Sequence, residues 1–139
     1  MLGIPLHFYL VHFPIALTIM AAVCDVRAYT GKRSELHQTG YTLILWASAG
    51  AAFAAISGLQ MLGARNAAVF ATIHAALGLG TGLVLIAVAM TRYSAKARQS
   101  ESGTTNLQAW LILELIAAVG VLAAAITGHR LVLGLVGLH

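Results

Sequence analysis

The chain has 139 residues, of which 60% are hydrophobic and only 9% are charged. A soluble domain carries about 25% charged residues, so this composition excludes an ordinary soluble enzyme or binding domain. The net charge of +4 is explained below by membrane topology and calls for no nucleic-acid partner.

The first apolar segment, residues 2–28, is long enough to cross a bilayer, which takes roughly 20 apolar residues. Its basic residues follow the apolar run instead of preceding it, unlike a secretory signal, so we expect this helix in the mature protein. It carries His7 and His12, and Pro14 is predicted to kink it near His12. Cys24 is the single cysteine, which excludes an internal disulfide and a C-x-x-C-H haem-attachment motif.

Two further spans are predicted over residues 40–62 and 67–92. Helices in lipid pack closely through small residues at four-residue spacing. The second span has one such row: Gly50, Ala54 and Gly58. The third span has another: His74, Gly78 and Gly82. The third-span row predicts an open groove beneath the imidazole, which a flat macrocycle would fit, and plain helix packing is the alternative.

The fourth span, residues 107–136, follows a polar connector and is longer than one crossing requires. Its register is therefore open. We expect an intermediate register in which Glu114 is partly buried towards the cytoplasmic side, because a carboxylate at mid-membrane costs about 2.5–3.5 kcal/mol. In every register His129 stays in the outer half, with Arg130 beside it.

The sequence thus predicts one all-α domain, residues 1–139, folded as an up-and-down four-transmembrane-helix bundle in the bacterial inner membrane. Six basic residues follow the first and third helices: Arg27, Lys32, Arg33, Arg92, Lys96 and Arg98. Only Arg65 and Arg130 lie on the opposite side. The positive-inside rule then puts both termini outside. Four aromatic residues are predicted at the cytoplasmic interface: Tyr29, Tyr41, Tyr93 and Trp110. His37 and His139 are predicted in solvated ends without a specific role.

Four of the six histidines are predicted in the outer half of the bundle: His7, His12, His74 and His129. Imidazole at membrane depth is costly and marks an ion path, a proton relay or a ligand site. At about 1.5 Å per residue, His12 lies roughly 13 Å down its helix and His74 roughly 10 Å down its own. These two are predicted to face each other as an inner pair, and His7 with His129 as an outer pair.

Several ligands or roles are compatible with such a cluster. Zinc also accepts several imidazoles, but membrane depth and the glycine groove favour a large apolar ligand. A proton or metal transporter needs a path that continues inwards, where the chain offers only Asp25, His37 and Glu114. The plainest alternative is that each histidine hydrogen-bonds a neighbouring helix. Non-covalent haem b, held by imidazole ligands, accounts for all of these observations.

Several short segments resemble one group of small four-helix bacterial membrane proteins, long catalogued as a domain of unknown function. The segments are His12-Phe13-Pro14-Ile15-Ala16-Leu17, Ser57-Gly58-Leu59, His74, and Gly128-His129 before a glycine-rich tail. Some members are described as membrane-bound b-type dihaem proteins that bind oxygen, so the resemblance implies a second haem. The family often has a histidine in its tail, where this chain reads Leu133-Gly134-Leu135-Val136-Gly137.

The sequence therefore predicts a membrane-bound b-type haem protein, with one or two haem b groups, that acts in electron transfer or in binding oxygen or another diatomic gas. The predicted iron ligands are His7, His12, His74 and His129. Gly78 and Gly82 are predicted to line the haem, and Arg130 and Arg65 to pair with its propionates. The alternative is a small transporter or accessory subunit without haem. No motif indicates hydrolytic chemistry. A quinone or a separate redox partner would exchange the electrons, and the sequence leaves homo-oligomerisation open.

Overall fold

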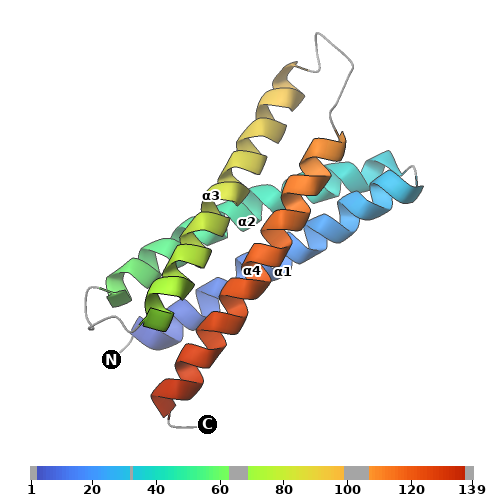
Figure 1. Ribbon diagram of the computed structural model, residues 1–139. Coiled ribbons are helices and arrows are strands. Elements are labelled where there is room, and N and C mark those ends of the chain that lie inside the picture. Colours follow the sequence, from blue (N-terminus) through green and yellow to red (C-terminus); the bar gives the residue numbers. More distant parts are fainter. Residues whose placement is uncertain (1–2, 32, 63–68, 99–106, 137–139) are drawn as a thin grey trace.

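The computed structural model describes residues 3–31, 33–62, 69–98 and 107–136. Within these ranges the chain forms four α-helices and no strand (Figure 1). The helices are α1 Gly3–Gly31, α2 Ser34–Leu62, α3 Val69–Arg98 and α4 Leu107–Val136. The predicted all-α four-helix fold is confirmed.

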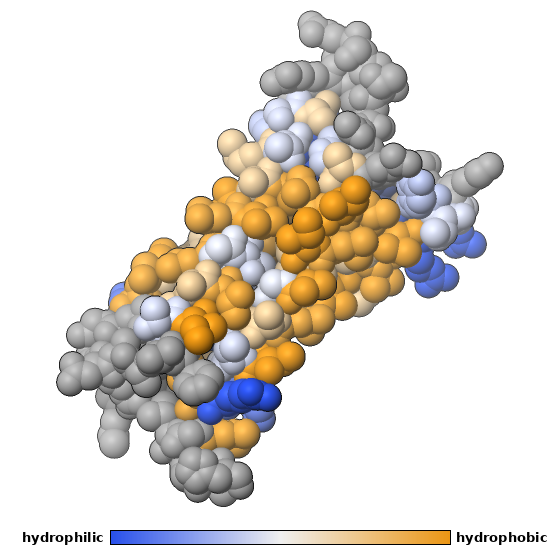
Figure 2. Space-filling view, viewed as in Figure 1, coloured by the Kyte–Doolittle hydropathy of each residue, from blue (hydrophilic) through white to orange (hydrophobic). Residues whose placement is uncertain are grey.

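Each of the four helices is long and apolar enough to cross a membrane. Many large apolar side chains point outwards, and Phe53, Leu83 and Val119 are each more than 60% exposed. Figure 2 shows the result as an apolar band across the middle of the molecule, with hydrophilic residues gathered towards the ends. Such a surface is suited to lipid chains and not to water.

Three helices extend beyond the predicted spans, and the first of them ends at Gly31 instead of residue 28. The second begins at Ser34 where a start near Gly40 was predicted, and the third continues past residue 92 to Arg98. A helix of 29 residues is roughly 43 Å long, whereas the hydrocarbon core of a bilayer is about 30 Å thick. Hydropathy therefore locates the membrane core, and polar turns continue the helix beyond it.

The helices form two antiparallel hairpins, α1–α2 and α3–α4, which cross face to face (Figure 1). Each helix packs against two neighbours, so α1 and α3 lie diagonally opposite each other, as do α2 and α4. The first turn of α1 and the last turn of α4 lie at the same end, which we call the histidine end. The opposite end is called the arginine end. Between them lies the core, formed by Ala21, Ile44, Leu85, Val88, Ala89, Ala117 and Val121.

The small-residue row of α2 packs against α1, as the sequence predicts. A Cβ atom at Gly50 would lie 3.0 Å from Cδ1 of Phe13 and 3.3 Å from Cδ of Pro14, so glycine permits this close approach. Helix α1 continues through Pro14 without interruption. Close packing of this hairpin fixes the position of both polar ends described next.

Candidate functional site

Two imidazoles meet at the histidine end of the bundle, one from each hairpin. His7 lies near the start of α1 and His74 near the start of α3. Their ring centroids are 6.4 Å apart and the ring planes are inclined at 87°. Both side chains are partly buried. Because α1 and α3 are diagonal neighbours, the two rings bridge helices whose backbones do not pack together.

The hydrogen bonds of Ser57 determine which nitrogen of His7 carries the proton. The Ser57 hydroxyl donates to the Ala54 carbonyl at 2.9 Å, so its Oγ is available to His7 only as an acceptor. His7 Nδ1 lies 2.8 Å from that Oγ and is the donor in this arrangement, in which the hydroxyl proton is directed at Ala54. The Nε2 atom of His7 is left with a free lone pair.

His74 has the same arrangement against α4, the helix that forms a hairpin with its own helix α3. Its Nδ1 lies 2.9 Å from the Ala124 carbonyl oxygen, which can only accept, so Nδ1 carries the proton. The Thr127 hydroxyl lies 3.3 Å from the same nitrogen and donates to backbone carbonyls of its own helix. His74 Nε2 therefore also keeps its lone pair.

This tautomer is the one found in histidines that bind metals. A ligating imidazole almost always donates its other ring N–H to a carbonyl, carboxylate or hydroxyl, which fixes the ring and leaves the second nitrogen for the metal. His7 and His74 are both held in this way, by Ser57 and by Ala124. In this tautomer each of the two rings keeps a lone pair on Nε2.

Two glycines allow the helices to close over these rings. A Cβ atom at Gly58 on α2 would lie 3.1 Å from Cε1 of His7, and one at Gly128 on α4 would lie 2.9 Å from Cε1 of His74. Such separations are tighter than ordinary side-chain contacts, so larger residues would push the imidazoles away. Gly58 and Gly128 therefore support the ring positions.

The structure does not form the predicted pair of His12 with His74. His12 is exposed on α1, and its Nδ1 donates to the Phe8 carbonyl of the same helix at 2.5 Å. Five residues separate it from His7, which turns it about 140° around the helix. His74 pairs with His7 instead.

The predicted outer pair of His7 with His129 is not formed either. His129 and Arg130 are both exposed on α4, and His129 makes no hydrogen bond or ring contact with His7 within the described residues. Arg65, His139 and the tail after Val136 lie outside the described residues. The roles of His12, His129 and Arg130 as ligands or propionate partners remain predictions.

The glycine row of α3 is open at one point and closed at the other. A Cβ atom at Gly78 would meet nothing within 4 Å, whereas one at Gly82 would lie 3.8 Å from Cβ of Ala51 on α2. The space beside Gly78, one turn after His74, is therefore the open part of the predicted groove. No described group of three or more His, Cys, Asp or Glu residues can hold a bare metal ion.

A second polar centre, missed by the sequence analysis, occupies the arginine end. It is called here the arginine cluster and contains one residue from each helix: Asp25, His37, Arg92 and Glu114. Arg92 Nη1 donates to Asp25 Oδ2 at 2.5 Å and also to Glu114 Oε1. Arg92 Nη2 donates to the His37 carbonyl at 3.0 Å. Asp25, Arg92 and Glu114 are only 1%, 3% and 0% exposed, so these charges are shielded from solvent.

Two aromatic rings cover the guanidinium. The Arg92 Cζ atom lies 5.7 Å from the ring centroid of Tyr41 and 5.7 Å from that of Trp110. Trp110 also stacks on His37, with centroids 5.8 Å apart and planes at 14°. The sequence predicted Tyr41 and Trp110 as interfacial anchors, whereas here they pack over a buried cation.

Three sequence predictions are corrected by this cluster. His37 does not lie in a solvated end without a role, since its ring bonds Asp25 at 2.8 Å. Glu114 is fully buried instead of partly buried. Arg92 is a buried helical residue and not a loop charge, because α3 continues to Arg98. The available signal was the pair of acidic residues inside apolar segments, each of which needs a partner at membrane depth.

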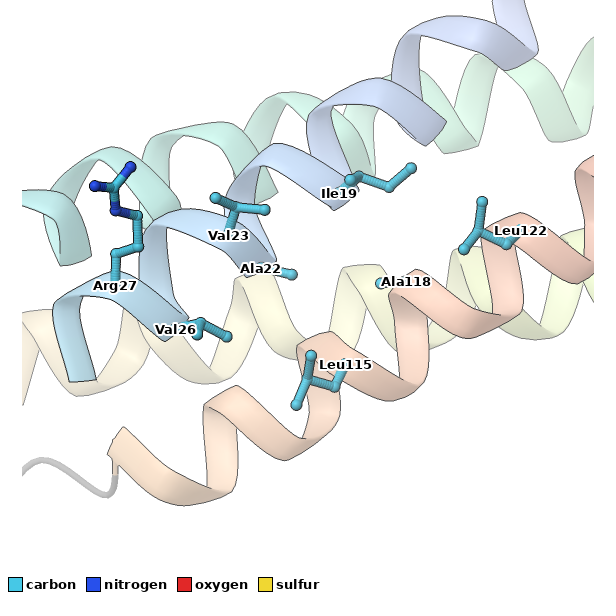
Figure 3. Close-up of a pocket in the computed structure, with 8 residues that line it drawn as sticks. All are labelled: Ile19, Ala22, Val23, Val26, Arg27, Leu115, Ala118 and Leu122. Atoms are coloured by element: carbon cyan, nitrogen blue, oxygen red, sulfur yellow. The ribbon is translucent and has the colours of Figure 1, made fainter. Parts of the chain in front are cut away.

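An apolar groove of about 280 Å³ lies between α1 and α4. Its walls include Val26 on α1 and Leu115 and Leu122 on α4, and the Arg27 guanidinium points away from α4 (Figure 3). The groove carries no polar group that would select a ligand. Lipid chains are sufficient to fill it, and we assign it no functional role.

The chain was compared with known families, proteins and structures. A family model described as "Predicted membrane protein (DUF2231)" matches residues 3–136. No curated protein and no solved structure matches the chain significantly. The family match covers all four helices and agrees with their apolar surfaces.

Proposed function

We propose that this chain, which belongs to the DUF2231 family of predicted membrane proteins and spans the membrane four times, binds haem b at its histidine end. The observation that carries the proposal is the pair of imidazoles from α1 and α3. His7 and His74 both carry their proton on Nδ1, and their ring centroids are 6.4 Å apart.

The chemistry and spacing of these donors fit an iron porphyrin. His7 and His74 would each offer one imidazole nitrogen to the iron, and their ring centroids are 6.4 Å apart. Two protein ligands are too few for a bare zinc ion in a structural site, but they are enough for haem, whose porphyrin supplies the other four nitrogens. Gly58 and Gly128 hold the two rings in place by close contact, and the open space of the glycine row lies beside Gly78.

Ligation by both histidines favours electron transfer over gas binding. Haem supplies a one-electron iron couple whose potential depends on the axial ligands and their hydrogen bonds. If His7 and His74 both hold the haem, neither histidine leaves a place for oxygen or another diatomic gas, and the group would serve as a one-electron carrier. Ser57 and the Ala124 carbonyl orient the ligands and raise their basicity. A membrane quinone or a separate redox protein would exchange the electrons.

A second haem would take its ligands from the two remaining outer histidines. His12 and His129 are exposed on α1 and α4, two helices that pack against each other. Arg130, next to His129, is available to a propionate group. The proposal for the first haem does not depend on this second one.

We further propose that the arginine end faces the cytoplasm of a bacterial cell and that both termini lie outside. Arg92 is buried in the bundle and no longer counts as a loop charge. Among the described residues four further basic residues lie towards the arginine end, Arg27, Arg33, Lys96 and Arg98, whereas Arg130 lies towards the histidine end. The positive-inside rule therefore favours the same orientation as before.

Haem content tests the proposal directly. The protein is expressed with ample haem, purified in detergent, and its haem-to-protein ratio and Soret absorbance are measured. His7→Ala and His74→Ala should each lose the haem held by this pair, which is nearly all of the bound haem if the protein holds one group and half of it if the protein holds two. His139→Ala serves as the matched control and should keep the wild-type ratio.

The same measurement separates the rival functions. A full haem complement in both His7→Ala and His74→Ala would contradict the assigned ligands. A colourless wild-type protein would support the alternative, a small transporter or accessory subunit without haem. A ratio that falls by half in His12→Ala or His129→Ala would reveal the second haem.

A further inference from the structure

The arginine cluster contains two carboxyl groups and one guanidinium inside a membrane-spanning bundle. Asp25 and Glu114 both accept a hydrogen bond from the same nitrogen, Nη1 of Arg92. With both carboxyls ionised and His37 neutral, the centre carries a net negative charge, which is costly when it is buried. One added proton on the carboxyl pair makes the centre neutral.

The two carboxyl groups differ in their hydrogen-bond partners. Both oxygens of Asp25 accept, Oδ1 from His37 Nδ1 at 2.8 Å and Oδ2 from Arg92 Nη1 at 2.5 Å. Glu114 Oε1 accepts from Arg92, but the buried Oε2 has no hydrogen-bond partner among the described residues. A buried carboxylate oxygen has given up its hydrogen bonds to water, and without a donor in the protein nothing offsets this cost in free energy. The added proton therefore belongs on Glu114.

His37 connects this buried pair to the end of the bundle. Its side chain is 27% exposed, whereas that of Asp25 is 1% exposed. Its Nδ1 lies 2.8 Å from Asp25 Oδ1, an acceptor, and 3.1 Å from Arg92 Nη2, a donor. A protonated Nδ1 bonds the carboxylate and an unprotonated Nδ1 bonds the guanidinium. The ring thus has a stable partner in either state.

We propose that Asp25, His37, Arg92 and Glu114 form an exchangeable proton-binding site, whose ligand is one proton taken from water at the arginine end. His37 takes a proton at Nε2 from hydronium at this end and passes its Nδ1 proton to Asp25 Oδ1, which leaves a neutral ring with its proton on Nε2. The Asp25 carboxyl then passes the proton to the Glu114 carboxyl, which accepts from the same Arg92 nitrogen, and the proton rests there. Arg92 stays charged throughout and donates to both carboxyls.

The other ionisable groups around the cluster do not compensate its charge. From α1 and α4 the groups bonded to Arg92 are Asp25 and Glu114, and α1 also carries the exposed residues Arg27 and Tyr29 near this end. On α2 and α3 the additional groups are Tyr41 and Lys96, and the Lys96 Nζ lies 5.1 Å from the Tyr41 ring centroid and is exposed. The site lies at the end opposite the imidazole pair, and the inference does not rest on haem binding.

Infrared spectroscopy of the full chain in lipid nanodiscs tests this site. A protonated carboxyl group has a C=O stretching band that shifts when hydrogen is replaced by deuterium. The wild-type protein should show such a band, it should shift in deuterated buffer, and its intensity should fall as the pH rises. The band should be lost in Glu114→Gln, whose amide still accepts from Arg92. Glu35→Gln, at an exposed position on α2, is the matched control and should keep it.

Three results would overturn the proposal. The first is a folded wild-type protein without the band at any pH, and the second is a band that neither exchanges with deuterium nor responds to pH. The third is a band that remains in folded Glu114→Gln. If Glu114→Gln does not fold, Glu114→Asp decides the assignment, because the shorter carboxyl should shift the band and an unshifted band contradicts it. An ion pair with a purely structural role does not predict a carboxyl band whose intensity changes with pH.

Discussion

Ser57 donates its hydroxyl proton to the Ala54 carbonyl, which leaves its oxygen free to accept only from His7. Ser57 therefore orients the His7 ring by a hydrogen bond to Nδ1, and we expect no contact between Ser57 and the haem. On α2 Ser48 forms the same kind of bond, from its Oγ to the Leu45 carbonyl at 2.8 Å, but no histidine lies beside it. The two serines provide a matched comparison within one helix.

Replacement of Ser57 by alanine should weaken haem binding by roughly 10–100-fold, the usual effect of removing a group that orients a metal ligand. His7 Nδ1–H would lose its acceptor, so the ring would no longer be held in one tautomer. Haem titration of the apoprotein, followed by the Soret band, measures the change. Ser48→Ala should bind like the wild type, and equal affinities in all three proteins would contradict the role of Ser57.

At the scale of the helices, glycine marks the places where packing is closest. A Cβ atom at Gly40 on α2 would lie 2.6 Å from Oδ1 of Asp25, whereas one at Gly80 on α3 would meet nothing within 4 Å. The same substitution is therefore expected to have opposite consequences at the two positions. Gly40 keeps α2 close to the buried carboxylate, and Gly80 lies on an open surface.

Gly40→Ala should destabilise the protein by about 1–3 kcal/mol, the usual cost of overpacking a filled interior. Gly80→Ala should leave stability unchanged or raise it by up to about 1 kcal/mol, because alanine is the better helix former. Thermal unfolding in detergent, followed by circular dichroism, measures both. A Gly40→Ala protein as stable as Gly80→Ala would show that the contact with Asp25 carries no packing constraint.

The four spans were predictable from sequence because length and apolar content are local properties. The pairing of His74 was not, since it depends on where each helix begins. His7 is the fifth residue of α1 and His74 the sixth of α3, so these two share a depth, whereas His12 lies more than one turn deeper. Which helices are diagonal neighbours also requires the fold.

The arginine cluster was hidden for a related reason. Asp25 and Glu114 stood out as costly residues in apolar segments, but their cation was counted among the loop charges. A hydropathy profile ends a span where polar residues begin, and Arg92 lies beyond that point although α3 continues. Only the three-dimensional arrangement shows that one guanidinium serves two carboxyls from different helices.

At the scale of the whole molecule, the uneven distribution of basic residues predicts an orientation that labelling can test. With Cys24 replaced by alanine, single cysteines are placed at Arg33, between α1 and α2, and at Arg130 on α4, both of which are exposed. A membrane-impermeant maleimide added to intact spheroplasts should label Arg130→Cys. It should label Arg33→Cys only after permeabilisation. The reverse labelling pattern would show that the arginine end faces outwards and would contradict the proposed topology.

Each hairpin has polar contacts of its own. In α1–α2, His7 bonds Ser57 and Asp25 bonds His37; in α3–α4, His74 bonds Ala124 and Arg92 bonds Glu114. Between the hairpins, His7 meets His74, and Arg92 bonds Asp25 and His37.

The first hairpin alone therefore supplies Asp25 with one hydrogen-bond partner, His37, and its Oδ2 gains the Arg92 donor only when the second hairpin packs against it. Both polar centres are completed only when the two halves meet, so each reports on correct assembly.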